Sequence, residues 1–140
     1  MYNTRIEIEL EPVGSPTVLV SAGVFMEQAT IDHPVTRTYD INQQSGPLTI
    51  SVEMLGKDDN DPTTAVIIKS IKFNGITDPK FLWAGAYYPS YPKHFANQPD
   101  LKLALPGQTY LSWNGIYELE VTVPIFTWMH QTLGLGWIYE

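Results

Sequence analysis

Four consecutive polar residues, Asp58, Asp59, Asn60 and Asp61, carry the densest local chemistry in this sequence. Calcium is bound by several hard oxygen atoms on flexible loops, and this run offers carboxylate, amide and backbone oxygens. Asp, Asn and the following Pro62 are equally the residues that form a solvated turn between strands. The spacing excludes an EF-hand, whose loop needs a glycine and a glutamate that this run lacks. A calcium site through Asp58, Asp59 and Asp61 and a purely structural turn are both open, and the composition favours the turn.

Large aromatic side chains gather in two segments outside the regular sequence patterns. Aromatic faces stack on sugar rings and tyrosine hydroxyls can bond sugar hydroxyls, but the same residues also supply most of the area of subunit interfaces. An apolar chain end either closes the core or docks on a neighbour. We therefore expect an interface, with glycan binding as the alternative, at Trp83, Tyr87, Tyr88, Tyr91 and Phe95 and at the C-terminal Trp128, Trp137 and Tyr139, beside Phe126 and Met129.

The sequence carries no recognisable catalytic signature. His33, His94 and His130 are too far apart to form a local metal-ligand motif, and the common nucleophile, zinc and phosphate-loop motifs do not occur. Glu118 and Glu120 share one strand face, as a glycosidase pair could, but they alternate with apolar residues and are expected to face solvent. We predict that the protein is not an enzyme and keep a glycoside-processing enzyme as a third hypothesis.

The elements that position these residues are predicted to be strands. Apolar and polar residues alternate in Arg5–Glu11, Leu48–Met54 and Tyr117–Val123, as a strand with one buried face requires. Shorter β-rich runs lie at Thr17–Val20, Val24–Gln28, Val35–Ile41 and Ala65–Phe73. Turn residues separate them about every ten residues, which is typical of a β-sandwich. We predict an all-β, jelly-roll-like antiparallel β-sandwich that forms one domain over residues 1–140.

Three local expectations complete this fold. Asn114-Gly115 is the dipeptide that best fits a two-residue hairpin turn, so we predict a hairpin over Thr109–Val123. Ala84–Gly107 is rich in proline, glycine and aromatic residues, which predicts a long ordered loop without a central strand. Pro124–Thr132 can form one short helical turn, because proline suits a first helical position and Ile125, Trp128 and Met129 lie on one side.

Charge limits the partners. Lys and Arg total 8 against 15 Asp and Glu, a formal net charge of −7. Such a surface repels phosphate backbones and anionic membranes, so nucleic acid is not an expected partner. No stretch approaches the roughly 20 apolar residues of a membrane span, and the N-terminus does not resemble a signal peptide. The absence of cysteine excludes disulfides and thiolate chemistry.

The segment VEMLGKDDNDPTTAVIIKSIKFNG resembles the core of calcium-dependent xylan-binding-type carbohydrate-binding modules. Those modules are small β-sandwiches in which aspartates beside a strand hold calcium, which in turn grips sugar hydroxyls. The resemblance implies Asp58, Asp59 and Asp61 as calcium ligands and Asn74-Gly75 as the turn after the strand. Thr64-Ala65 stands where those modules commonly have Arg-Asn, a departure at the calcium site.

The whole chain is also similar in pattern to small virion proteins of tailed bacteriophages, notably in FLWAGAYYPSYP, LSWNGIYELEVTVPIFTW and the Gly-Trp-Ile-Tyr ending. This resemblance implies a structural protein of the virion, assembled in the host cytoplasm, that decorates the capsid or forms part of the tail. Its expected partners are other virion proteins and further copies of itself. The alternative is a glycan-binding adhesion module that recognises a host-surface glycan, with or without calcium.

Overall fold

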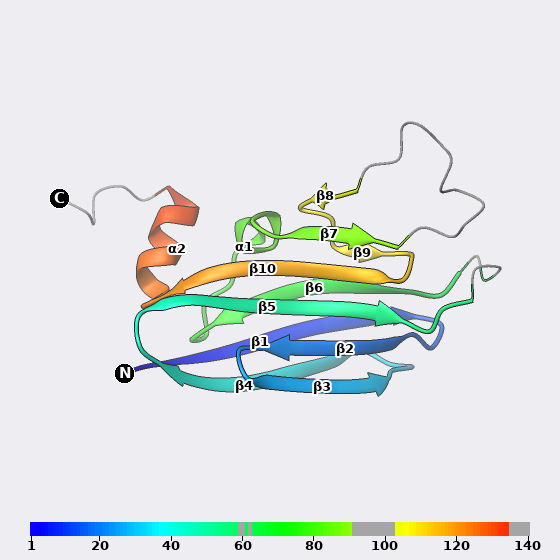
Figure 1. The fold of residues 1–140 in the computed structure, drawn as a ribbon, viewed down its shortest axis with the longest axis horizontal. Coiled ribbons are helices and arrows are strands. Elements are labelled where there is room, and N and C mark those ends of the chain that lie inside the picture. Colours follow the sequence, from blue (N-terminus) through cyan, green and yellow to red (C-terminus); the bar gives the residue numbers. More distant parts are fainter. Residues whose placement is uncertain (59–60, 62, 91–102, 135–140) are drawn as a thin grey trace.

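The computed structural model describes residues 1–58, 61, 63–90 and 103–134. Within these residues the chain forms ten β-strands and two short helices. The strands build two antiparallel sheets that stack face to face (Figure 1). This confirms the predicted antiparallel β-sandwich.

One sheet has four strands and the other has six. The four-stranded sheet has the order β4-β1-β6-β9, with β1 at Tyr2–Val13, β4 at Val35–Gln43, β6 at Ala65–Phe73 and β9 at Tyr110–Leu111. The six-stranded sheet has the order β3-β2-β5-β10-β7-β8. Its strands are β2 at Thr17–Ala22, β3 at Phe25–Thr30, β5 at Gly46–Leu55, β7 at Ala86–Pro89, β8 at Leu105–Pro106 and β10 at Gly115–Val123.

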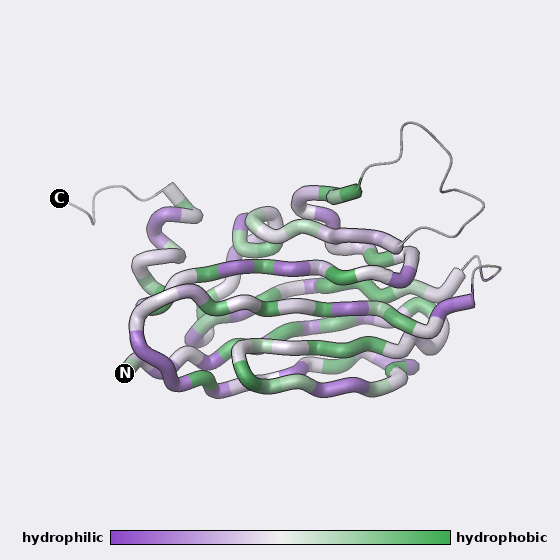
Figure 2. The backbone as a smooth tube through the Cα atoms, in the orientation of Figure 1, coloured by the Kyte–Doolittle hydropathy of each residue, from purple (hydrophilic) through white to green (hydrophobic). Residues whose placement is uncertain are grey.

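The core lies between the two sheets and follows the alternation of the sequence. Figure 2 shows hydrophobic and hydrophilic residues alternating along the long strands. Every apolar residue predicted to point inward is buried: Ile6, Ile8 and Leu10 on β1, Leu48, Ile50, Val52 and Met54 on β5, and Tyr117, Leu119, Val121 and Val123 on β10. The period-two pattern therefore predicted the inner faces of these strands correctly.

The predicted hairpin over Thr109–Val123 is wrong. Residues Tyr110–Leu111 pair with β6, whereas Gly115–Val123 pair with β5 and β7, so the connection between them crosses from one sheet to the other. The reason is tertiary. The Asn114 amide pairs with the backbone of Lys57 at 2.9 Å in both directions, so this residue joins two loops and does not turn a hairpin.

The other Asn-Gly dipeptide makes the tight turn. Asn74 and Gly75 have φ angles of 50° and 83°, the positive values that a two-residue primed turn requires. Phe73 and Ile76 close it through backbone hydrogen bonds of 2.8 and 2.9 Å. Asn74 also accepts the Arg5 backbone N–H through its side chain at 2.8 Å. The turn implied by the family resemblance is thus present at Asn74-Gly75.

The segment predicted as a long loop without a central strand contains one. β7 lies between β10 and β8 in the six-stranded sheet, so it is an interior strand. Its proline, Pro89, occupies the last position of the strand. The residues before it can therefore still donate their backbone N–H groups to the neighbouring strands. Residues 91–102 lie outside the described part of the chain.

Two short helices lie along the same side of the sandwich, α2 at its end and α1 farther along, before β7 (Figure 1). α1 (Pro79–Trp83) begins at Asp78, whose side chain caps the Lys80 N–H, and α2 (Ile125–Leu133) extends the helical turn predicted at Pro124–Thr132 by one residue at its C-terminal side. Phe73, Phe81 and Trp128 anchor both helices, with ring centroids 5.2 to 5.7 Å apart. Among the described helices, none has the length and apolar character needed to cross a membrane.

Candidate functional site

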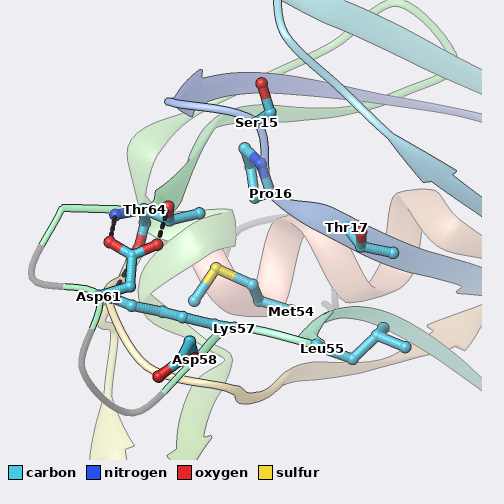
Figure 3. A pocket seen from close by; sticks show the side chains of 10 residues that line it. Ser15, Pro16, Thr17, Met54, Leu55, Lys57, Asp58, Asp61 and Thr64 are labelled. Carbon is cyan, nitrogen blue, oxygen red and sulfur yellow. Dashed lines mark hydrogen bonds between the residues drawn. The ribbon is translucent and has the colours of Figure 1, made fainter.

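A pocket of about 230 Å³ opens at the end of the sandwich opposite α2 (Figures 1 and 3). Two connections form it: the turn between β1 and β2, and the segment that leads from β5 to β6. The lining combines hydroxyl, carboxylate and ammonium groups with a small apolar floor, and consists of Ser15, Pro16, Thr17, Met54, Leu55, Gly56, Lys57, Asp58, Asp61 and Thr64. Asp58 and Asp61 of the acidic run therefore border a cavity.

The Asp61 carboxylate organises the turn that follows it. Its Oδ1 atom accepts the backbone N–H groups of Thr63 at 2.9 Å and Thr64 at 3.1 Å, and the Thr63 hydroxyl at 3.2 Å. Its Oδ2 atom accepts the Thr64 hydroxyl, as Figure 3 shows. These hydrogen bonds, led by the one from Thr64, hold the pKa of Asp61 well below its usual value. Both carboxylate oxygens are thus committed to the turn.

The Lys57 ammonium joins the same segment to the connection before β10. Nζ donates to the carbonyl oxygen of Thr64 at 2.7 Å and to that of Ser112 at 2.6 Å. It also lies 5.1 Å from the centroid of the Trp113 ring, within cation–π range. With the backbone pairing of Asn114 and Lys57, these contacts tie the two loops together.

The aromatic residues predicted as an interface or glycan platform divide into two groups. Trp83 and Tyr88 are 62% and 44% exposed and can present a ring to a partner. Tyr87 is only 1% exposed and exchanges hydrogen bonds between its hydroxyl and the backbone of Trp113. Trp128 is 8% exposed and packs between Phe73 and Phe81.

Tyr87 and Trp128 are therefore core residues, which corrects their assignment to a binding surface. Trp128 fills the core beside the two helices, and Tyr87 fills it beneath the connection that carries Trp113. The remaining predicted residues, Tyr91, Phe95, Trp137 and Tyr139, lie outside the described part of the chain, as do His94 and Asp59.

The carboxylates of Glu118 and Glu120 face solvent, as predicted. They line a second open depression of about 210 Å³ on the outer face of the six-stranded sheet, together with Thr49, Ala84, Ala86 and Tyr88. Both glutamates are exposed and lie two residues apart on one strand. No described residue faces them across a cleft as a second catalytic carboxylate would.

Of the residues that line the pocket, sequence reasoning proposed only Asp58 and Asp61 as site residues and missed the others, among them Lys57 and Thr64. Lys57 and Thr64 flank the acidic run, but a lone lysine and a threonine next to an aspartate carry no motif. A signal existed in the Asp-Pro-Thr-Thr order, because an aspartate followed by hydroxyl residues is typical of a side-chain-capped turn. The partner carbonyl of Ser112 is 55 residues from Lys57, and only folding brings the two together.

In comparisons with known proteins, this chain matches solved structures by fold and matches nothing by sequence. No protein-family model and no curated protein matches the sequence. A solved structure described as vCBM60 in complex with galactobiose matches with a TM-score of 0.55 and 17% identity, covering 84% of this chain and 99% of the other. The likeness is one of fold.

A selenomethionine form of vCBM60 matches similarly, with a TM-score of 0.54 and 14% identity over 83% of this chain and 89% of the other. That structure is described with a circular permutation that links two families of calcium-dependent carbohydrate binding modules. The present chain therefore shares the β-sandwich fold of these two structures.

Because the second neighbour is described with calcium-dependent modules, we asked whether the described side chains could hold a calcium ion. Among the described residues, no three acidic or histidine side chains converge in a way that could hold a metal ion. Asp61 already accepts hydrogen bonds from Thr63 and Thr64, which hold it in the turn. The predicted set of Asp58, Asp59 and Asp61 stays a prediction, because Asp59 lies outside the described residues.

Proposed function

We propose that this protein is a non-catalytic carbohydrate-binding module that binds a neutral oligosaccharide at the pocket between the β1–β2 turn and the β5–β6 connection. The observation that carries the proposal is the match of the whole sandwich to vCBM60, which spans 84% of this chain. The polar pocket at the loop end of the sandwich supports it.

The chemistry of the pocket suits sugar hydroxyls. Ser15 offers a hydroxyl group that can donate or accept, and Thr17 offers one that also bonds the Thr30 hydroxyl at 2.9 Å. The exposed Asp58 carboxylate adds acceptor oxygens to the lining. Carboxylates at the rim disfavour an anionic ligand, and so does the net charge of −7. Neutral sugars are therefore the expected class, and repulsion should weaken the binding of uronic acids and sulfated glycans.

Binding to an array of neutral oligosaccharides, with galactobiose among the probes, tests the proposal. We expect the wild type to bind, and D58A to lose affinity by about tenfold or more, since a charged hydrogen-bond partner contributes about 1.5–3 kcal/mol. The matched control is W83A, which removes an exposed ring distant in sequence from the pocket. Loss of binding in W83A with D58A unaffected would move the site to the aromatic surface, and a wild type that binds no sugar would reject the function.

A structural role in a virion is the second candidate, and exposed apolar side chains favour it. Trp83 lies at the end of α1 and Phe126, 51% exposed, lies on α2. Such a surface suits assembly with other virion proteins or with further copies of the chain. Incorporation of the double variant W83A/F126A into particles distinguishes the two roles, because assembly requires these side chains and sugar binding at the pocket does not.

A further inference from the structure

The structural neighbours belong to calcium-dependent families, yet the loops of this chain already contain a cation of their own. We propose that the Lys57 ammonium takes the place of a metal ion in fixing the β5–β6 connection, so that the pocket is formed without calcium. The inference concerns the loops themselves, and it holds whether or not the pocket binds sugar.

The environment of Nζ is the first argument. Two backbone carbonyl oxygens, from Thr64 and Ser112, point at it from opposite loops at 2.7 and 2.6 Å. Hard cations bind where several carbonyl oxygens converge. Hydrogen bonds from a charged donor are about twice as strong as those from a neutral one. The Trp113 ring, 5.1 Å away, adds a further electron-rich face. Lys57 is only partly exposed, which strengthens each of these contacts.

The state of Asp61 is the second argument. Its carboxylate accepts four hydrogen bonds from Thr63 and Thr64, three at Oδ1 and one at Oδ2, so the described part of the turn is held by protein donors without a metal ion. The Lys57 and Asp61 contacts meet at Thr64, whose carbonyl accepts from the lysine while its N–H and hydroxyl donate to the aspartate. One residue therefore links the ammonium and the carboxylate into a single polar network that holds the described part of the turn.

Thermal unfolding of the wild type with calcium chloride or with EDTA tests the proposal directly. We expect the same Tm in millimolar calcium, in EDTA and in plain buffer, because a ligand raises Tm only if it binds the native state. A saturable rise of Tm with calcium, reversed by EDTA, would overturn the proposal. This measurement uses the wild-type protein, so it tests the proposal even if a substitution prevents folding.

Two lysine-to-methionine variants test the ammonium. K57M keeps most of the side-chain volume and removes the charge, and we expect it to lower Tm by roughly 5 °C or more, because two carbonyl groups lose charged donors. The matched control is K69M, whose ammonium makes only an exposed ion pair with Glu11 at 3.2 Å and should shift Tm by about 1 °C or less.

K57R keeps the charge but not the compact ammonium, and its Tm should fall between those of K57M and the wild type. Equal Tm values for K57M and K69M would refute the role of Lys57. Galactobiose binding, measured with and without EDTA, separates this inference from the proposed function. If galactobiose binds in neither condition, sugar recognition is rejected, and the Tm measurements still test whether the Lys57 ammonium replaces calcium.

Discussion

At the residue scale, the role predicted for Asp61 from the sequence differs from the role that its side chain has in the structure. In the sequence it is one of three aspartates that could hold calcium. In the structure its two oxygens accept four hydrogen bonds from the next two threonines, so it shapes the turn that carries Thr64 to the pocket. The lowered pKa of Asp61 records this stabilisation of the ionised carboxylate.

The lowered pKa of Asp61 predicts a pH dependence of stability. Because the folded-state pKa lies below the ordinary value of 3.8, the unfolded chain takes up the proton first as pH falls. The contribution of Asp61 is therefore complete above that ordinary value and is lost as pH falls below it. We expect D61N to have a lower Tm than the wild type at neutral pH.

The difference in Tm between wild type and D61N should shrink as pH falls below 3.8, because a protonated carboxyl resembles the amide that replaces it. Thermal unfolding followed by circular dichroism at a series of pH values measures this difference. D78N is a suitable control, since Asp78 caps α1 away from the pocket. A constant difference across the acidic range would contradict the assignment to Asp61.

At the scale of elements, the approach of β7 to β10 depends on Gly115. This glycine pairs with Met54 of β5 on one side and with Pro89 of β7 on the other. A Cβ atom at this position would lie 2.5 Å from the carbonyl oxygen of Tyr88 and 2.7 Å from Cα of Pro89. Backbone atoms cannot move aside as a flexible side chain can, so the two strands would have to separate.

We predict that G115A destabilises the protein more than G46A does. The two glycines have similar φ angles, 153° and 146°, but a Cβ on Gly46 would meet nothing within 4 Å. Both variants carry the cost of an unfavourable backbone conformation, and G115A adds a steric cost of about 1–3 kcal/mol. Chemical denaturation measures both unfolding free energies, and equal values would show that β7 has room to shift.

At the scale of the whole molecule, the distribution of charge limits what the pocket can bind. The chain carries a formal net charge of −7, and Asp58 and Asp61 line the pocket. Long-range repulsion therefore opposes anionic ligands, and it falls with ionic strength as the Debye length shortens. A neutral ligand feels none of this effect.

We predict that the affinity for a neutral oligosaccharide changes by less than about twofold between low and physiological salt. A uronic-acid oligosaccharide of equal length, used as the control, should bind more weakly and gain affinity as salt rises. Isothermal titration calorimetry at two salt concentrations measures both. Tighter binding of the acidic sugar at low salt would contradict a repulsive pocket.

The sequence by itself determined the inner faces of the long strands and the sandwich that they form. Alternation at period two needs no knowledge of partners, because a strand with one buried face must bury every second residue. The Ile6, Ile50 and Leu119 positions follow from it directly. The helix after Pro124 was also predictable, since its apolar residues recur at helical spacing.

Only the tertiary structure decided which contacts the local signals make. Of two Asn-Gly dipeptides, Asn74-Gly75 turns the chain, while Asn114 instead pairs with Lys57 across 57 residues. Tyr87 enters the core because it lies on the inner face of β7, whereas Tyr88 on the opposite face is exposed. The pocket depends on the meeting of Lys57, Thr64 and Ser112, and loops far apart in sequence meet only when the sheets stack. Such encounters are set by packing, which a local pattern does not encode.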